Sequence, residues 1–582
     1  MSGAKTWTTL AWAFAPDVNS SFRLAAATLS ALLMNVVFIS GLHFTLFQLS
    51  DQDLPVMGGA ILLFVVLSVA APRISAREPR VSNLVVAMSF ALLAALLWGA
   101  TYALMRNFGV SYDEVMVLFD MRIYANGVVA EPLAPEWKAY AVSLVPAFLL
   151  NEDAPSAVVS AYLPMNAVLR LGFAQIADPA LMNPVMFALG GIALYDITRR
   201  QFQGDNGAIM VALVLYAMSM QALTAAMTPY AMTAHLALNT VWLAAFLRGG
   251  RWHVLAIAVG AVATGLHQLV FHPLFIAPFL LQRLLRGDWR VVLGYAVAYG
   301  MILAGWILFP MLAGVLTGTA QLAGGSHTEF FRDRLLPLLL YRDPATLPLM
   351  IMNLLRFFAW QHLALLPLLF AAASLIGQRG SLVRPVTLGI AFGIAMPALL
   401  LPYQGHGWGY RYLHGYIASF ALLGAFGFRR LREIDAPRAW GALVICTVAT
   451  LLAMAWLTWR IDTFVTPHVK LERYLAAVNA DQVIVETEIA SNTLDGRWAA
   501  NAIDLIRNQP DLSNRPLRLS SRKLSDEMAL ELCMRGSVAL VDRNTQKAIG
   551  FSLNQPDRSE RFEALSRRLV AEAAAGRCRL AS

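Results

Sequence analysis

Charged residues are scarce in this chain of 582 residues, because Asp, Glu, Lys and Arg together make up 14% of it. A soluble globular domain usually carries roughly 25%. Hydrophobic residues make up 58% and gather in repeated apolar runs of about 20 residues, the length that spans a bilayer. The composition excludes an ordinary soluble protein and predicts a polytopic membrane protein.

Cysteine is also rare, with three residues in the chain. Cys446 lies inside an apolar run, whereas Cys533 and Cys578 lie near the C-terminus, and no CxxC or Cys/His spacing typical of zinc sites occurs. We therefore predict no structural metal site. A Cys533–Cys578 disulfide is compatible with the sequence if that region lies outside the cytoplasm.

Excess positive charge is confined to part of the chain. The net charge is +9, but residues 461–582 hold 17 Lys/Arg and 16 Asp/Glu, so +8 belongs to the rest. That excess sits in short loops between apolar runs, where Lys and Arg set the orientation of membrane proteins. We expect membrane lipids, and not nucleic acid, as partners.

The apolar runs predict about thirteen transmembrane helices. They are residues 24–47, 55–71, 83–104, 180–198, 208–225, 230–247, 254–268, 270–284, 291–317, 348–376, 385–402, 411–428 and 439–459. With the N-terminus in the cytoplasm, every short Arg-rich loop then faces the cytoplasm, as the positive-inside rule requires. Treating 254–284 as one broken helix would reverse all later loops, which favours two separate passes there. The segments that face outward are 105–179, 318–347, 403–410 and everything after 460.

The last segment, residues 461–582, differs in kind, with 33 charged residues among 122. QVIVETE (482–488) and SVALVD (537–542) are typical of strands. ANAIDLIRN (500–508) and SERFEALSRRLVAEAAA (559–575) are typical of amphipathic helices. Alternating strands and helices predict a small α/β domain, here on the non-cytoplasmic side.

An acidic pair, Asp113 and Glu114, follows the third predicted span in VSYDEVMVLFDMRIYANG. A short amphipathic helix comes next, with an apolar stripe suited to the bilayer surface. The stripe consists of Met116, Phe119 and Ile123. The pair therefore opens an outward-facing loop of interfacial helices and two prolines, in EPLAPEW.

This layout resembles the GT-C superfamily of membrane glycosyltransferases, in particular the polyprenyl-phosphate-sugar-dependent branch with the protein O-mannosyltransferases and the lipid A aminoarabinose transferase (glycosyltransferase family 39-like). The resemblance rests on Asp113–Glu114 with MRIYANG and the proline-containing loop, on ALGGIALYDITRRQFQGDNGAIMVALVLYAMS, and on GWGYRYLHGY. It implies an all-α catalytic module over residues 83–460. Residues 1–82 depart from the family as an extra transmembrane hairpin without an assigned role.

The resemblance implies an enzyme that transfers a sugar from a polyprenyl-phosphate donor to a hydroxyl of a lipid, glycan or protein acceptor. The acceptor proton needs a base, and the resemblance assigns that role to Asp113, with Glu114 as a helper or a structural partner. The alternative is that both residues simply begin a helix, where acidic side chains are favoured by the macrodipole.

The departing lipid phosphate needs a cation, and Arg411 is the strongest candidate, because its planar fork suits phosphate oxygens. It lies in the predicted outer turn beside His406 and Tyr412. The alternative is that Arg411 only reaches toward the interface. Further basic candidates on this side are Arg122, Lys138 and Arg170.

A histidine turn, TGLHQLVFHPLF, places His267, Gln268 and His272 on the same side as Asp113. Polar residues at membrane depth usually face a cavity or a partner, so we expect substrate binding there. The five-residue spacing matches no metal motif, although the resemblance leaves a divalent cation open. The outer loop GGSHTEFFRDR, with His327, Glu329 and Asp333, is expected to be an ordinary loop and not a lid.

Three alternatives to this function remain open from the sequence. A polysaccharide polymerase or ligase would keep the fold and change the acceptor. A transporter of lipid-linked cargo predicts inverted repeats and broken helices at mid-membrane, and a scaffold predicts a dispensable Asp113. The expected location is a bacterial inner membrane, with the N-terminus cytoplasmic and the C-terminal domain periplasmic.

Overall fold

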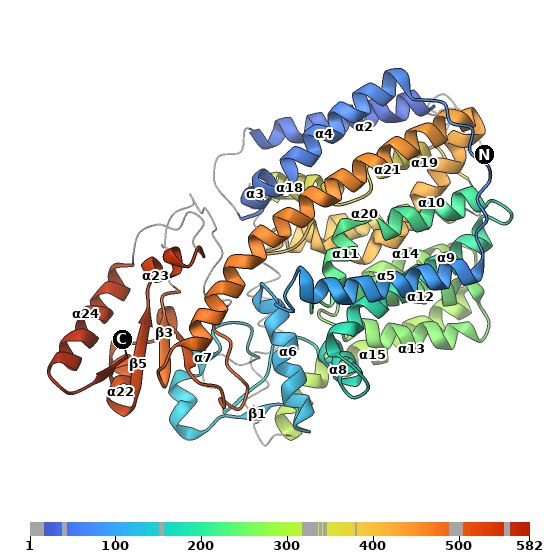
Figure 1. The fold of residues 1–582 in the computed structure, drawn as a ribbon. Helices are drawn as coiled ribbons and strands as arrows, with labels where there is room; N and C mark the ends of the chain where they lie inside the picture. The colour runs from blue at the N-terminus through green and yellow to red at the C-terminus, as the bar shows by residue number, and fades with distance from the viewer. Residues whose placement is uncertain are drawn as a thin grey trace.

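The computed structural model describes residues 17–37, 44–150, 156–316, 336, 340, 346–378, 381–487, 505–551 and 559–581. The apolar segments of the chain form a bundle of helices (Figure 1). The helices of this bundle are α2 Val18–Val37, α3 Phe44–Gln48, η1 Leu49–Asp53 (a π-helix), α4 Leu54–Ala70, α5 Asn83–Ala103, α9 Met182–Gln201, α10 Asn206–Ala217, α11 Met220–Ala226, α12 Met232–Arg248, α13 Trp252–Thr264, α14 Phe271–Leu285, α15 Trp289–Leu316, α18 Thr346–Ala359, α19 Leu365–Ala373, α20 Val383–Leu400, η6 Arg411–Tyr416 (a 3-10 helix) and α21 Ile417–Ala477.

Smaller elements form the segment between α5 and α9 and the C-terminal region. The first group is α6 Tyr112–Ala125, β1 Glu131–Pro132, η2 Pro135–Tyr140, α7 Ala141–Leu144, β2 Ala157–Val158, α8 Met165–Ala174 and η3 Pro179–Leu181. The second group is β3 Gln482–Val485, β4 Leu517–Ser520, η8 Ser521–Lys523, α22 Asp526–Arg535, β5 Ser537–Val541, α23 Arg543–Ala548, α24 Glu560–Ala574 and β6 Arg579–Leu580.

The chain has several helices that suit a membrane. Six in the described residues are long and apolar enough to cross one, or seven if α10 and α11, bent by 54°, form one span. They are Thr45–Ala70, Asn83–Ala103, Pro179–Gln201, Trp289–Gly314, Val383–Leu400 and Arg411–Ala477. Helices α13, α14 and α18 are apolar but shorter. A multi-pass membrane protein is therefore supported, whereas the number thirteen is not confirmed.

The long element α21 contains two of the predicted spans. Its backbone leaves helical geometry at Asp435, and the rings of Phe428 and Trp440 on either side lie 4.8 Å apart. His406, just before the element, stacks on Phe464 near its far end, with ring centroids 5.0 Å apart. The chain therefore reverses at Asp435, as the Arg-rich turn between predicted spans 411–428 and 439–459 required.

Two other predictions about helices concern residues 254–284 and residues 24–47. The region 254–284 forms two helices, α13 and α14, as the placement of basic residues predicted. The predicted span 24–47 is described in two parts, α2 up to Val37 and α3 from Phe44, and residues 38–43 lie outside the described residues, so this span stays a prediction. After this gap the chain stays helical, and Gln48 of α3 and Gln52 and Asp53 of the π-helix η1 are buried polar residues.

The C-terminal region contains a four-stranded parallel sheet with strand order β4-β3-β5-β6 (Figure 1). Side chains of a strand alternate between faces. Ile484 therefore packs with Leu565 of α24 on one face, whereas Val483 and Val485 pack against Leu475 at the end of α21 on the other. Strands β3 and β5 and helix α24 form where the sequence pattern predicted them.

Two further features of this region concern its sequence predictions. Cys533 of α22 and Cys578, next to β6, form a disulfide. The predicted helix 500–508 is not found where it can be seen, because the described part, from Leu505 onward, is a single 3-10 position followed by irregular chain. Its last residue, Asn508, instead donates hydrogen bonds to the carbonyls of Leu144, at 2.8 Å, and Arg518, at 2.7 Å.

Helix α6 lies against protein and not against a bilayer surface. Its predicted apolar stripe, of which Met116 and Phe119 are part, is buried in a core shared with Leu517 and Leu519 of the C-terminal sheet. The Tyr112 hydroxyl also donates to the Ile506 carbonyl at 3.1 Å. The expectation of an interfacial helix is therefore corrected, because the C-terminal region covers the stripe and fixes α6 in place.

Candidate active site

Glu114 holds the start of α6. Its Oε2 accepts hydrogen bonds from the Val110 N–H (2.8 Å), the Ser111 N–H (2.9 Å) and the Ser111 hydroxyl (3.0 Å), which makes a capping box. The side chain is fully buried and does not line the pocket described below. Glu114 is thus engaged with the start of its own helix, and its neighbour Asp113 is the acidic residue at the pocket.

Burial raises the pKa of Glu114 from 4.5 to about 7, and the hydrogen bonds from Ser111 offset only part of this increase. Between those two values the folded protein keeps a proton that the unfolded chain has released. Stability from this group therefore falls as pH rises through the window. A Glu114→Gln variant keeps the capping box, since Gln also serves there, but it does not titrate.

We expect the thermal midpoint of the wild type, relative to Glu114→Gln, to fall as pH rises from about 5 to about 7. Differential scanning fluorimetry of both purified proteins across that range measures this. Parallel pH profiles for the two proteins would contradict a buried, proton-binding Glu114.

Asp113 forms an ion pair with Arg411 and accepts a hydrogen bond from the Tyr162 hydroxyl. Its side chain is 11% exposed and that of Arg411 is 18% exposed. Burial alone would raise the pKa of Asp113, but the charge of Arg411 and the Tyr162 hydrogen bond outweigh it, so the pKa lies below its ordinary value. The carboxylate is therefore ionised at neutral pH and can accept a proton.

Arg411 begins η6, directly after a tight turn at 404–410. Gln404 accepts a hydrogen bond from the Arg411 N–H at 2.9 Å and donates to the Gly409 carbonyl at 3.0 Å. Gly405 (φ +66°) and Gly409 (φ +68°) have left-handed backbone, which glycine adopts most readily. A Cβ at Gly409 would also lie 2.4 Å from Gln221 Oε1, so the turn needs glycine there.

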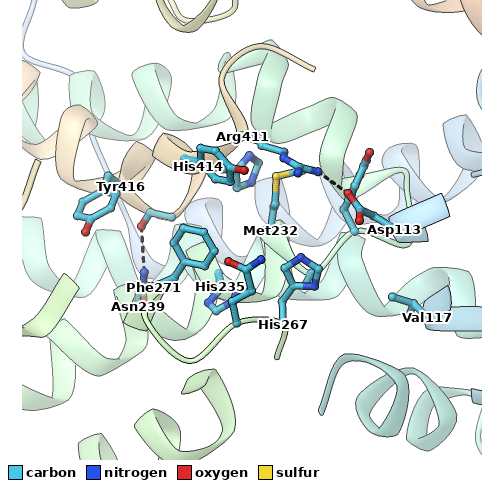
Figure 2. A pocket seen from close by; sticks show the side chains of 15 residues that line it. Asp113, Val117, Met232, His235, Asn239, His267, Phe271, Arg411, His414 and Tyr416 are labelled. Carbon is cyan, nitrogen blue, oxygen red and sulfur yellow. Dashed lines mark hydrogen bonds and ion pairs between the residues drawn. The ribbon is translucent and has the colours of Figure 1, made fainter. Parts of the chain in front are cut away.

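A pocket opens beside the Asp113–Arg411 pair (Figure 2). Five of the predicted site residues line it, and they are Asp113, His267, Gln268, Arg411 and Tyr412. The His267 ring packs on Tyr162, with ring centroids 4.2 Å apart, and Tyr412 stacks on Phe271 at 5.7 Å. Residues of α6, η6 and the α13–α14 turn, far apart in the sequence, therefore meet at one pocket.

The pocket also contains polar residues that sequence reasoning did not find. His235 of α12 and His414 of η6 are 6% and 1% exposed, and no ring nitrogen of either has a hydrogen-bond partner among the described residues. Asn239 and the Tyr416 hydroxyl lie further along the same wall (Figure 2). The ring nitrogens of His235 and His414 and the Tyr416 hydroxyl need partners when buried, and a ligand with several hydroxyls would supply them.

Besides Glu114, three predicted site residues lie outside this pocket. His272 is fully buried, with Nδ1 bonded to Asn239 Oδ1 and Nε2 to the Tyr299 hydroxyl, each at 2.7 Å, so both of its ring nitrogens already have partners between helices. His406 contacts Gln48 Nε2 at 3.4 Å and stacks on Phe464, behind the turn. Arg122 is exposed near the far end of α6, roughly 13 Å along the helix from Asp113.

The other basic candidates, Lys138 and Arg170, also lie outside the pocket. Lys138 is exposed, and the buried Arg170 donates to the Pro179 carbonyl at 2.8 Å. Residues His327, Glu329 and Asp333 lie outside the described residues. Within the described ranges, no group of three or more His, Cys, Asp or Glu side chains is arranged to hold a metal ion, and we assign no metal ligand.

Comparisons with solved structures give similarity to ArnT. No family model matches the chain, and no curated protein matches it. Among solved structures it is similar to ArnT from Cupriavidus metallidurans in the apo state, with 13% identity, 72% of this chain and 84% of that chain covered, and a TM-score of 0.45. The structure of ArnT bound to undecaprenyl phosphate gives 14% identity, 73% and 85% coverage, and a TM-score of 0.45.

Proposed function

We propose that this protein is a membrane glycosyltransferase that moves a sugar from a polyprenyl-phosphate donor to an acceptor hydroxyl. The observation that carries the proposal is the ion pair between Asp113 and Arg411 at the mouth of a pocket. A carboxylate that takes a proton and a cation that receives a phosphate are the two groups that this transfer needs.

In this mechanism Arg411 binds the phosphate of the donor. The bond between the anomeric carbon and the phosphate oxygen breaks, and its electron pair leaves with the lipid phosphate. The guanidinium stabilises that developing charge, because charge-assisted hydrogen bonds to phosphate are strong and Arg can make two in parallel. Its contact with Asp113 shows that the guanidinium already faces the pocket.

Asp113 takes the proton of the acceptor hydroxyl as the oxygen forms its bond to the anomeric carbon. In the unliganded protein Arg411 keeps the pKa of this carboxyl low, which makes it a weak base. When a phosphate draws the guanidinium away, the carboxylate loses that stabilisation and becomes more basic. Binding of the lipid phosphate thereby makes Asp113 a stronger base.

The sugar itself fits the inner wall of the pocket. The free ring nitrogens of His235 and His414 and the Tyr416 hydroxyl are suited to hydroxyls that need both donors and acceptors. Phe271 supplies an apolar surface on the same wall (Figure 2). His267 and Gln268 lie nearer Asp113, where we place the acceptor hydroxyl.

The location that we propose is a bacterial inner membrane with the pocket and the C-terminal region on the periplasmic side. The Cys533–Cys578 disulfide supports this placement, because such bonds persist in oxidising compartments. The Arg-rich turns between helices support a cytoplasmic location for the opposite side of the protein, because basic loops are typically cytoplasmic. Residues 461–582 are, in this proposal, a periplasmic α/β domain packed on the outer loop.

The disulfide gives a prediction of its own. Its closed loop spans 45 residues, so we expect Cys533→Ser to lower the free energy of unfolding of this region by about 4 kcal/mol. Limited proteolysis as a function of urea measures this. Thiol trapping in intact cells should find both cysteines oxidised, and two free thiols there would contradict the periplasmic placement.

The test of the function is a transfer assay. Purified protein in nanodiscs meets a panel of radiolabelled polyprenyl-phosphate sugars together with a membrane extract as the source of acceptor. We expect label to move from one donor to an extract component and polyprenyl phosphate to be released. No transfer from any donor, with labelled lipid instead crossing the bilayer of proteoliposomes, would overturn the proposal in favour of a transporter.

A further inference from the structure

The N-terminal helices contain a buried polar cluster where they meet α18. The sequence assigned these helices no role. The guanidinium of Arg356 bonds to Asp53 Oδ2 at 3.0 Å, and the Trp360 indole donates to Asp53 Oδ1 at 2.6 Å. Both charged side chains are 0% exposed. Gln48 accepts a further hydrogen bond from Arg356. We call these four residues the Asp53 cluster.

The Asp53 cluster reaches the turn that precedes Arg411. The remaining nitrogen of the Arg356 guanidinium, Nη2, donates to the Gly407 carbonyl at 2.8 Å. Gln48 Nε2 lies 3.4 Å from His406 Nδ1. One guanidinium thus joins the N-terminal helices, α18 and the turn, because each of its three nitrogens contacts a different group.

A second set of bonds fixes the other side of the same turn. Gln221 of α11 donates to the Tyr410 carbonyl at 2.8 Å and accepts from the Tyr410 N–H at 3.2 Å. Gln404 holds the Arg411 N–H at 2.9 Å. Only three residues lie between Gly407 and Arg411, so the place of the guanidinium opposite Asp113 depends on both anchors.

Stability alone is a poor reason for such a buried ion pair. The cost of removing two charges from water often exceeds the attraction between them, and an apolar pair of similar volume is frequently as stable. The backbone around Asp53 is also unusual, because Leu49–Asp53 is a π-helix, a form common at functional sites. Both features indicate that the orientation of the Arg356 side chain matters. Hydrogen bonds and ion pairs fix such an orientation, whereas an apolar pair does not.

We propose that the N-terminal helices position the donor-binding arginine. Asp53 orients Arg356, and Arg356 holds the Gly407 carbonyl so that Arg411 faces Asp113. Residues 1–82 are, on this proposal, a support of the catalytic site. The proposal rests on the proposed function only for its ligand, since the placement of the turn can be measured without one.

The test uses variants that remove the link to Gly407. Asp53→Leu/Arg356→Met removes both charges together, which avoids leaving one buried charge unpaired. Arg356→Lys keeps the charge but has a single head group in place of the planar fork. The matched control is Asp196→Leu/Arg248→Met, which removes an ion pair of 2.6 Å roughly 24 Å along α12 from the pocket end of that helix.

The first measurement is hydrogen exchange of the turn, by mass spectrometry in nanodiscs. We expect the Tyr410 and Arg411 amides to exchange at least about 10-fold faster in both cluster variants than in the wild type or the control, because an opened turn no longer holds these amides. Protection equal to that of the wild type in the double variant, folded by size-exclusion chromatography, would overturn the proposal.

The second measurement is binding of undecaprenyl phosphate to the same proteins. We expect the Kd to rise about 10-fold in both cluster variants, the effect of losing one well-placed contact to a charged group, and to stay unchanged in the control. Unchanged affinity in the cluster variants would overturn the positioning role. If the wild type binds no undecaprenyl phosphate, the proposed function fails, and the exchange rates still decide whether the cluster positions Arg411.

Discussion

Asp113→Asn is expected to lower the rate of sugar transfer by about 10²- to 10⁴-fold, the usual contribution of a general base. Asn has nearly the same shape and still accepts a hydrogen bond from Tyr162, but it cannot take the acceptor proton. Because Arg411 then lacks its carboxylate partner, we expect donor affinity to stay the same or increase. Single-turnover transfer and equilibrium binding of the donor separate these two effects.

Glu114→Gln is the matched control for this variant, since it alters the adjacent carboxylate and keeps the capping hydrogen bonds. We expect its transfer rate to remain within about threefold of wild type, because Glu114 does not line the pocket and Gln preserves the start of α6. A rate that collapses in Glu114→Gln and survives in Asp113→Asn would assign the base to Glu114.

Arg411→Gln is expected to weaken binding of polyprenyl phosphate by about 10- to 100-fold, the value of a charge-assisted contact, and to lower the transfer rate as well. The rate falls because the guanidinium also stabilises the leaving phosphate in the transition state. Isothermal titration or thermophoresis in nanodiscs measures the binding. The same variant also frees Asp113, whose pKa should rise toward its usual value.

Arg106→Gln is the control for Arg411. Arg106 pairs with Asp462 at 2.7 Å and has a partly exposed side chain, 29% accessible, and it does not line the pocket. We expect its affinity for polyprenyl phosphate to equal that of the wild type. Equal affinity in Arg411→Gln as well would show that the phosphate binds elsewhere.

The sequence predicted correctly the strands and helices whose formation depends on the pattern of neighbouring residues. The β-branched run at 482–488 became β3, and the apolar face of 559–575 became α24, because both patterns need only a neighbouring surface to pack on. The placement of charge separated α13 from α14, because only two passes at 254–284 keep the later Arg-rich loops on the cytoplasmic side. The predicted span 24–47 stays a prediction, because residues 38–43 lie outside the described residues.

The site shows the same division between local and long-range information. Asp113 and Arg411 were predicted one by one, but their ion pair joins residues 298 positions apart. His235 and His414 lie in apolar helical segments. The signal that could have identified them is that an ionisable residue within such a segment usually faces a cavity or a polar partner. For His272 the same signal corresponds to partners within the protein, because Asn239 and Tyr299 satisfy its ring.

Glu114 and His406 show why a predicted site residue can lie one layer behind the site. Each is adjacent in sequence to the functional segment, yet each is turned toward its own backbone or toward the N-terminal helices. Sequence proximity gave the correct turn in both cases. The direction of the side chain depends on partners, such as Ser111 and Gln48, that only the folded chain brings into contact.

The most direct test of the account is a cryo-electron microscopy structure of the protein with undecaprenyl phosphate bound in nanodiscs. We predict a phosphate oxygen within about 3 Å of the Arg411 guanidinium, with Asp113 released from its ion pair and facing the space where the acceptor hydroxyl would lie. A phosphate bound away from this pocket, with the Asp113–Arg411 pair intact, would contradict the proposed donor site and the base that depends on it.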